Sequence, residues 1–301
     1  MRGDVQMRTM ESGYSTKEVT KVPGWHGLVA WDLLFNNLTT GLFLFAAVGE
    51  LALPGLLAPV AKAAYPVALV FLLTDLMLLV LDLGDPLRFH HMLRVFKPSS
   101  PMSLGTWSLT VYSLPLTLIV AIEAAQALNL LPPGSIVLEW VRKLAVIVGF
   151  LPAFGSLAYK GVLFSTSSQP GWKDARWMGG FVANSALMLG CAEMLAVSVL
   201  TGHSKAAASL RTVLMLLLPL NIIPAGLLFA EFHKTLLRLH RDRQVYLASV
   251  LLFVGGTLIP LVLLLMGDSA PGILGAASLI LLGGLAIRSL IIKIPHASRE
   301  K

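Results

Sequence analysis

Long apolar runs dominate this chain and are separated by short polar connections. Crossing a bilayer as a helix takes about 20 mostly apolar residues. Eight runs meet that length, at roughly 28–53, 62–83, 104–128, 140–160, 177–200, 212–231, 245–266 and 271–292. Their apolar residues do not alternate with polar ones, which argues against a membrane β-barrel. The pattern predicts an all-α integral membrane protein with eight transmembrane helices, and four helices followed by four favour two four-helix bundles.

Composition strengthens this prediction and limits the domain organisation. Of 301 residues, 56% are apolar and only 13% are charged, and the mean hydropathy is +0.78. These values are far from those of a soluble domain. We therefore expect a polar N-terminal segment over 1–27, a membrane domain over 28–292 and a polar tail over 293–301. Residues 1–27 contain no apolar core of a cleavable signal peptide.

The net charge of +7 reflects the placement of Lys and Arg in the connections. Eighteen of the 23 lie at the two termini or in the connections after runs two, four and six, and the other five lie on the opposite face. Cytoplasmic loops are the ones enriched in Lys and Arg. The bias predicts an inner-membrane protein with both termini in the cytoplasm. No sequence motif supports nucleic-acid binding.

Several polar residues interrupt the apolar runs. Asn36 and Thr40 lie inside the first run, and Asp75, Glu123 and Glu193 are carboxylic acids within later runs. Polar groups are costly inside a membrane and often mark function. They equally serve as hydrogen-bonding groups between helices, with Gly41 providing a close helix contact. We expect Pro219 and Pro224 to break the sixth run, and Pro260 the seventh.

The connection after the second run is unusually rich in charged and imidazole side chains. This connection, which we call the hinge, comprises residues 84–103 and contains Arg88, His91, Arg94 and Lys97. A simple interpretation is a solvated loop with charges that stop membrane transfer. His91 could instead exchange protons with a bound molecule, because histidine titrates near neutral pH.

Four short motifs resemble a known family. The sequence D-L-G-x-P-x-R-F-x-H-M-L-R begins at Asp82 and is followed by S-P-M-S-x-G-x-W from Ser100. Y-x-G-x-L-x-S-x4-P-x-W begins at Tyr159, and G-G-x-x-x-R ends at Arg288. Together they resemble the NrfD/polysulfide-reductase membrane-subunit family, and the likeness extends over nearly the whole chain.

The resemblance implies a membrane anchor that binds a quinone or quinol, either menaquinone or ubiquinone. It implies a ferredoxin-like partner with several [4Fe–4S] clusters and a molybdopterin catalytic subunit. The implied quinone site is a polar ring in which Asn36 and Tyr159 hold the carbonyls and His91 or Asp75 moves protons; the ring comprises Asn36, Thr40, Asp75, His91, Tyr112 and Tyr159. Asp75, Glu123 and Glu193 are the candidates for proton transfer across the membrane. The partner would dock on loops 84–103, 161–176 and 232–244, through Arg88, Arg94, Lys97 and Arg176.

Redox cofactors are not expected within the chain itself. A single cysteine, Cys191, cannot hold an iron–sulfur cluster. None of the seven histidines lies deep inside an apolar run, whereas a haem with two axial histidines needs them at one depth on facing helices. No His, Cys and Asp set has the spacing of a metal site.

Two other functions remain open at this stage. A secondary transporter would suit the proline-interrupted runs and the carboxylic acids inside the membrane, although it leaves the hinge motif unexplained. An anchor that binds no quinone is also compatible with the sequence. The side of the membrane on which a partner docks stays open as well, because a basic docking surface would mimic the positive-inside pattern.

Overall fold

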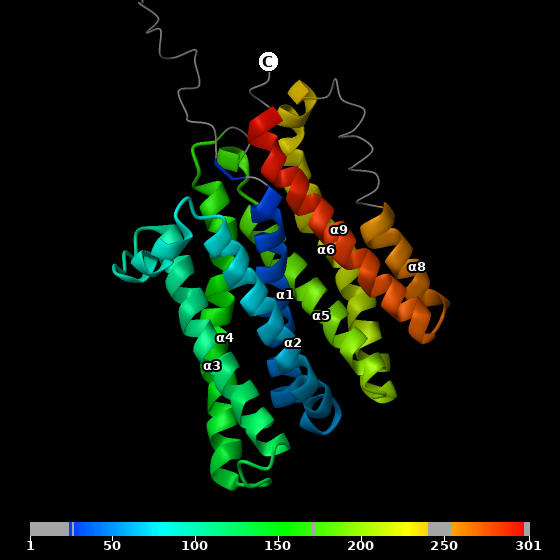
Figure 1. Ribbon diagram of the computed structural model, residues 1–301. Helices are drawn as coiled ribbons and strands as arrows, with labels where there is room; N and C mark the ends of the chain where they lie inside the picture. Colours follow the sequence, from blue (N-terminus) through cyan, green and yellow to red (C-terminus); the bar gives the residue numbers. More distant parts are fainter. Residues whose placement is uncertain (1–23, 26, 170–171, 240–253, 298–301) are drawn as a thin grey trace, which may run out of the picture.

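The computed structural model describes residues 24–25, 27–169, 172–239 and 254–297 (Figure 1). The described residues form helices α1 (Gly27–Ala52), α2 (Pro54–Leu81), η1 (Pro86–Leu93), α3 (Pro101–Ala127), α4 (Ile136–Ser165), η2 (Trp172–Asp174), α5 (Met178–Leu200), α6 (Ser204–Leu239), η3 (Val254–Leu258), α8 (Ile259–Met266) and α9 (Ala270–Ala297). No strand occurs among them. The all-helical prediction is therefore confirmed.

Seven helices of the described part are long and apolar enough to cross a membrane. They are α1 to α6 and α9, and they match seven of the eight predicted runs. The remaining run, 245–266, lies partly outside the described residues, and its described part forms the short apolar helices η3 and α8. The protein is thus a multi-pass membrane protein.

The helices form two groups that lie side by side (Figure 1). Helices α1, α2, α3 and α4 pack together in one group, which we call the first bundle. Helices α5, α6, α8 and α9 form the other, the second bundle, and the main contact between the two is α1 against α5. This arrangement agrees with the expected division into two sets of four.

Glycines allow α1 and α5 to cross at close range. A Cβ atom on Gly41 would lie 2.1 Å from the Ala186 carbonyl oxygen, and one on Gly190 would lie 2.1 Å from the Gly41 carbonyl carbon. Small residues let membrane helices approach in this way. The expected close helix contact at Gly41 is therefore confirmed.

Burial follows the polarity of each helix. In the most apolar stretch of each helix, 78% of the residues of α1 are buried but only 22% of those of α6. The mean hydropathy of the α1 stretch is the lower of the two. An apolar helix can face lipid, but a helix with polar residues must turn them toward other helices. This is why α1 lies at the centre of the molecule.

Helix boundaries follow local chemistry, with one departure from expectation. Ser100 caps α3 by accepting a hydrogen bond from the Ser103 backbone, and Pro101 follows at a position that needs no donor. Helix α6 continues through Pro219 and Pro224, so the predicted break of the sixth run is wrong. Membrane helices tolerate proline because neighbouring groups satisfy the freed carbonyls. In the seventh run, the π-helical turn η3 ends at Leu258, two residues before Pro260, which lies in the first turn of α8.

Candidate functional site

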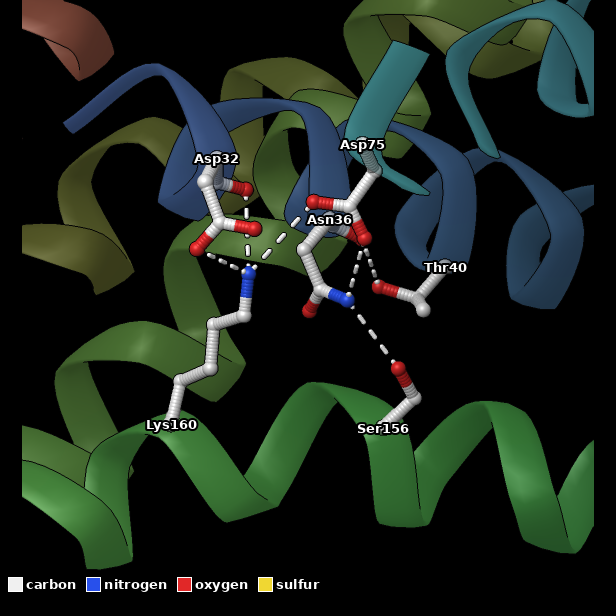
Figure 2. A network of polar contacts seen from close by, with 6 residues as sticks. All are labelled: Asp32, Asn36, Thr40, Asp75, Ser156 and Lys160. Atoms are coloured by element: carbon white, nitrogen blue, oxygen red, sulfur yellow. Dashed lines mark hydrogen bonds and ion pairs between the residues drawn. The ribbon is translucent and has the colours of Figure 1, made fainter. Parts of the chain in front are cut away.

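A network of polar side chains lies inside the first bundle (Figure 2). Helix α1 contributes residues spaced four apart, which places them on one helix face. Helix α2 contributes one carboxylic acid, and α4 contributes a hydroxyl and an ammonium group four residues apart. We call this the upper network; it comprises Asp32, Asn36, Thr40, Asp75, Ser156 and Lys160.

Lys160 joins two carboxylic acids in the upper network. Its Nζ lies 2.8 Å from Asp32 Oδ2 and 3.5 Å from Asp75 Oδ1. It also donates to the Asp32 backbone carbonyl at 3.1 Å. Three chain segments far apart in sequence are thereby joined by one ammonium group.

Asn36 connects the acids to the rest of α4. Its Nδ2 donates to Asp75 Oδ2 at 3.1 Å and to Ser156 Oγ at 3.0 Å. Thr40 donates to the Asn36 carbonyl of its own helix at 2.6 Å. The amide therefore fixes the position of Asp75 while Lys160 balances its charge.

The upper network is almost completely shielded. Asn36, Thr40, Ser156 and Asp75 are fully buried, and Lys160 is 2% exposed. With both carboxylates ionised, the three charged groups carry a net charge of −1. Isolated charges are very costly in such surroundings, so the paired arrangement is required for the bundle to form.

Two acceptor atoms of the upper network have no partner in the described part of the chain. They are Asp32 Oδ1 and Asn36 Oδ1, both of which are buried. Buried acceptors nearly always have a hydrogen-bond partner, and an exception calls for an explanation. A hydrogen-bond donor beside these two atoms would satisfy them.

Tyr112 of α3 contacts α1 at Thr39, beside the upper network. Its hydroxyl donates to the Thr39 carbonyl at 3.0 Å and lies 2.9 Å from Thr39 Oγ1, which in turn bonds to the Ala68 carbonyl at 2.7 Å. Tyr112 is fully buried. It belongs to the same bundle interior but does not contact the charged groups of the upper network directly.

Tyr159 is held by a glycine on α3. A Cβ atom on Gly105 would lie 2.1 Å from the Tyr159 ring, so only glycine lets the ring pack there. The neighbouring Lys160 Nζ lies 5.8 Å from the centre of the same ring. Of the six residues predicted for the quinone site, five thus lie in the interior of the first bundle.

His91 is the exception. It lies in η1 within the hinge, where its side chain is exposed and packs edge-on against His90 with 4.4 Å between ring centres. No described contact joins it to the upper network. The residues predicted for partner docking, Arg88, Arg94, Lys97 and Arg176, are exposed as well, and Arg88 pairs with Asp85 at 2.9 Å. Of the predicted docking loop 232–244, nearly all side chains lie outside the described residues.

A second charged cluster occupies the opposite end of the first bundle. Arg142 forms a two-pronged ion pair with Glu50, and its Nε lies 2.8 Å from Glu123 Oε1. The Tyr65 hydroxyl donates to Glu50 at 2.9 Å. We call this the lower cluster. Glu50 follows Asp32 by 18 residues, which is about 27 Å along α1.

Glu193, the third acid predicted to transfer protons, is isolated. It lies on α5 and is 6% exposed, and neither carboxyl oxygen has a hydrogen-bond partner among the described residues. The three predicted acids therefore do not form one connected chain of hydrogen bonds. Asp75 belongs to the upper network, Glu123 to the lower cluster, and Glu193 to neither.

Sequence reasoning missed four charged residues of these clusters. Asp32 and Glu50 lie near the ends of a run, and Lys160 and Arg142 were counted among interfacial charges. The four-residue spacing of Asp32, Asn36 and Thr40 is a signal that could have identified Asp32. No comparable signal pairs it with Lys160, because that contact spans 128 residues of chain.

Comparison with known proteins completes the assignment. A search of curated proteins finds no match to the chain. The family model described as polysulphide reductase, NrfD, matches residues 16–295, which is nearly the whole chain. The chain therefore belongs to the polysulphide reductase NrfD family, and it is a membrane subunit of an oxidoreductase complex.

Proposed function

We propose that this subunit binds a quinone or quinol and exchanges electrons between the quinone pool and an iron–sulfur subunit of its complex. The observation that carries the proposal is the upper network, whose two unpartnered acceptors lie beside the apolar core of the bundle. A quinone head group combines an apolar ring with two polar oxygens. Sites for such molecules are mostly apolar, with a few polar groups that fix orientation.

Individual residues of the upper network have suitable chemistry. The Ser156 hydroxyl is a hydrogen-bond donor, as a quinone carbonyl requires, whereas the N–H groups of Asn36 and Lys160 hold the network together. Asp32 and Asn36 provide acceptors for a quinol hydroxyl. Asp75 supplies a buried carboxyl group that can take up or release a proton. Bound menaquinone or ubiquinone would supply the two-electron chemistry.

The hinge supplies the proposed docking surface for the partner. It exposes apolar side chains, with Leu87 85% and Val95 68% exposed, beside the basic residues Arg88, Arg94 and Lys97. Exposed apolar patches with polar rims are typical of protein interfaces. Helix α2 ends at Leu81, six residues or about 9 Å beyond Asp75, and the hinge begins at residue 84. A partner cluster docked here would therefore lie near the upper network, and a molybdopterin subunit would complete the complex.

Binding of a quinone analogue to the purified complex tests this proposal. We expect a quinol-site inhibitor to bind the wild-type complex and to block electron transfer from quinol or to quinone. Replacing Asp75→Asn should lower turnover by about 10²–10⁴-fold, the usual contribution of a proton-transferring group. The exposed carboxylate of Asp268, at the other end of the molecule, provides the control Asp268→Asn, which should leave turnover unchanged.

The same measurements distinguish the alternatives. A complex that assembles normally but binds no quinone analogue would be a pure anchor. A subunit that purifies without an iron–sulfur partner and accumulates solute in vesicles would be a transporter. Either result would remove the proposal.

Proton translocation is a second candidate, and one observation favours it. The upper network and the lower cluster lie toward opposite ends of the first bundle, and the Phe43 ring lies between Tyr112 at 5.3 Å and Tyr65 at 5.8 Å. This places polar groups on both sides of a short aromatic barrier. Complexes in sealed vesicles should then acidify or alkalinise the interior during turnover, and Arg142→Gln should abolish that signal. Unchanged internal pH during rapid turnover would exclude translocation.

A further inference from the structure

Lys160 makes unequal contacts with its two acids. Two of its contacts go to Asp32, at 2.8 Å to the side chain and 3.1 Å to the backbone, and the third goes to Asp75 at 3.5 Å. The 3.5 Å separation is at the limit of a hydrogen bond. The ammonium group therefore lies nearer to Asp32, with Asp75 within reach of a small side-chain rotation.

Hydrogen-bond accounting shows where the upper network is incomplete. The three N–H groups of Lys160 face three acceptors, and both Nδ2 hydrogens of Asn36 are used. The unused positions are acceptors, Asp32 Oδ1 and Asn36 Oδ1. The gap on Asp32 is thus complementary to a group that brings its own hydrogen, such as a hydroxyl.

We infer that Asp32 exchanges a proton directly with the bound carrier and that Lys160 moves between Asp32 and Asp75 as that proton arrives or leaves. Asp32 is the residue that exchanges the proton with the carrier, Asp75 passes protons onward from the network, and Lys160 is a positioning residue. The inference rests on the proposed quinone function and assigns roles to three residues within it.

Charge counting explains the movement of Lys160. When Asp32 is ionised, the ammonium group is held mainly by Asp32. A proton on Asp32 removes that charge, so Asp75 becomes the only anion and attracts Lys160 more strongly. The charged groups then carry a net charge of 0 instead of −1, which favours the protonated state in this buried site.

The step balances in either direction of electron flow. When a quinol is oxidised, one O–H bond of the carrier breaks and one O–H bond forms on Asp32, while an electron passes to an iron–sulfur cluster of the partner. After that proton has left Asp32, the second O–H bond breaks in the same way, its proton goes to Asp32 and the second electron passes to the partner's clusters. When a quinone is reduced, the clusters supply two electrons, and Asp32, which is reprotonated between the two steps, delivers two protons one after the other.

A charge-neutral double variant tests the inference in the intact membrane complex. Removing one partner of a buried ion pair leaves a charge unpaired, whereas removing both is often neutral for folding. In Asp32→Asn/Lys160→Met, Asp75 loses its cation but keeps the hydrogen bond from Asn36, and a proton on Asp75 makes the network neutral. We therefore expect this variant to assemble, to bind a quinol-site inhibitor within about threefold of wild type, and to lose turnover by at least about 100-fold. The control is Arg211→Met/Asp268→Asn, which removes a different ion pair at the other end of the molecule.

A purely structural role predicts a different pattern. In that case Lys160→Met, which leaves two buried carboxylates without a cation, should fail to assemble while the double variant regains wild-type turnover, a result that would overturn the inference. In that case the complex would still bind the inhibitor, so the proposed quinone-binding function would stand while the roles of Asp32 and Lys160 would be refuted. If the wild-type complex itself binds no inhibitor, the proposed function fails first.

Infrared difference spectroscopy on the wild-type complex provides a test that needs no variant to fold. Reducing and reoxidising the bound carrier should produce a carboxyl C=O band from a protonated acid. The band should disappear in Asp32→Asn and persist in Asp268→Asn. A wild-type difference spectrum without any carboxyl protonation change would overturn the inference.

Discussion

Arg142 provides the sharpest prediction about stability. Its guanidinium is 7% exposed and satisfies Glu50 and Glu123 together. Replacing Arg142→Met keeps a long apolar side chain but leaves two carboxylates without their cation. Breaking a buried ion pair on one side costs about 3–5 kcal/mol.

This cost corresponds to a loss of roughly 10²- to 10³-fold or more in the equilibrium between folded and unfolded states. The measurement is reversible unfolding in lipid nanodiscs or mixed micelles, with the midpoint compared between variants. Glu50→Gln added to Arg142→Met should recover most of the loss, because Glu50 is the better buried of the two acids.

Arg211→Met is the matched control. Arg211 pairs with Asp268, whose side chain is 72% exposed, and ion pairs open to solvent contribute about 0–1 kcal/mol. If Arg142→Met destabilises no more than Arg211→Met, or if the double variant is worse than the single one, then the lower cluster does not act as a buried ion pair.

Three further outcomes can be measured with single substitutions or small sets. Gly41→Ala should destabilise by about 1–3 kcal/mol because its new methyl group meets the α5 backbone, whereas Gly226→Ala, which has open space, should not destabilise in the same unfolding assay. Trp172→Phe keeps an aromatic ring but loses the 2.8 Å bond to an α9 carbonyl, and we expect a cost of about 1–3 kcal/mol. Replacing the exposed hinge cations Arg88, Arg94 and Lys97 with neutral residues should lower the affinity for the partner and make that affinity less dependent on salt. Lys143→Gln, at the opposite end of the bundle, should change neither.

The sequence predicted the fold well because bilayer physics leaves few choices. Apolar length determines the number of helices, and seven of the predicted spans coincide with long helices. The proline argument at α6 failed because it applied a rule for soluble helices to a membrane helix. The second helix also begins earlier than predicted, at Pro54, since proline is well suited to the first turn.

The candidate site was only partly predictable. Asn36, Thr40 and Asp75 were recognised because polar residues stand out in an apolar run. Lys160 was not, because a charge near a helix end is normally interfacial. Its burial becomes visible only when α1, α2 and α4 are assembled, since hydropathy carries no information about which charges meet.

Helix α1 also sets a demand on biogenesis. It leaves the ribosome with Asp32, Asn36 and Glu50 and with none of their later partners. Lys160 follows Asp32 by 128 residues, which at ordinary translation speed is a delay of roughly 6–26 s. During that interval the polar side chains of α1 would be unpaired inside the lipid bilayer, which is energetically costly. We therefore expect the stable integration of α1 to need an insertase or chaperone until the fourth helix is synthesised, so that depletion of such a factor reduces insertion of this segment more than that of the others.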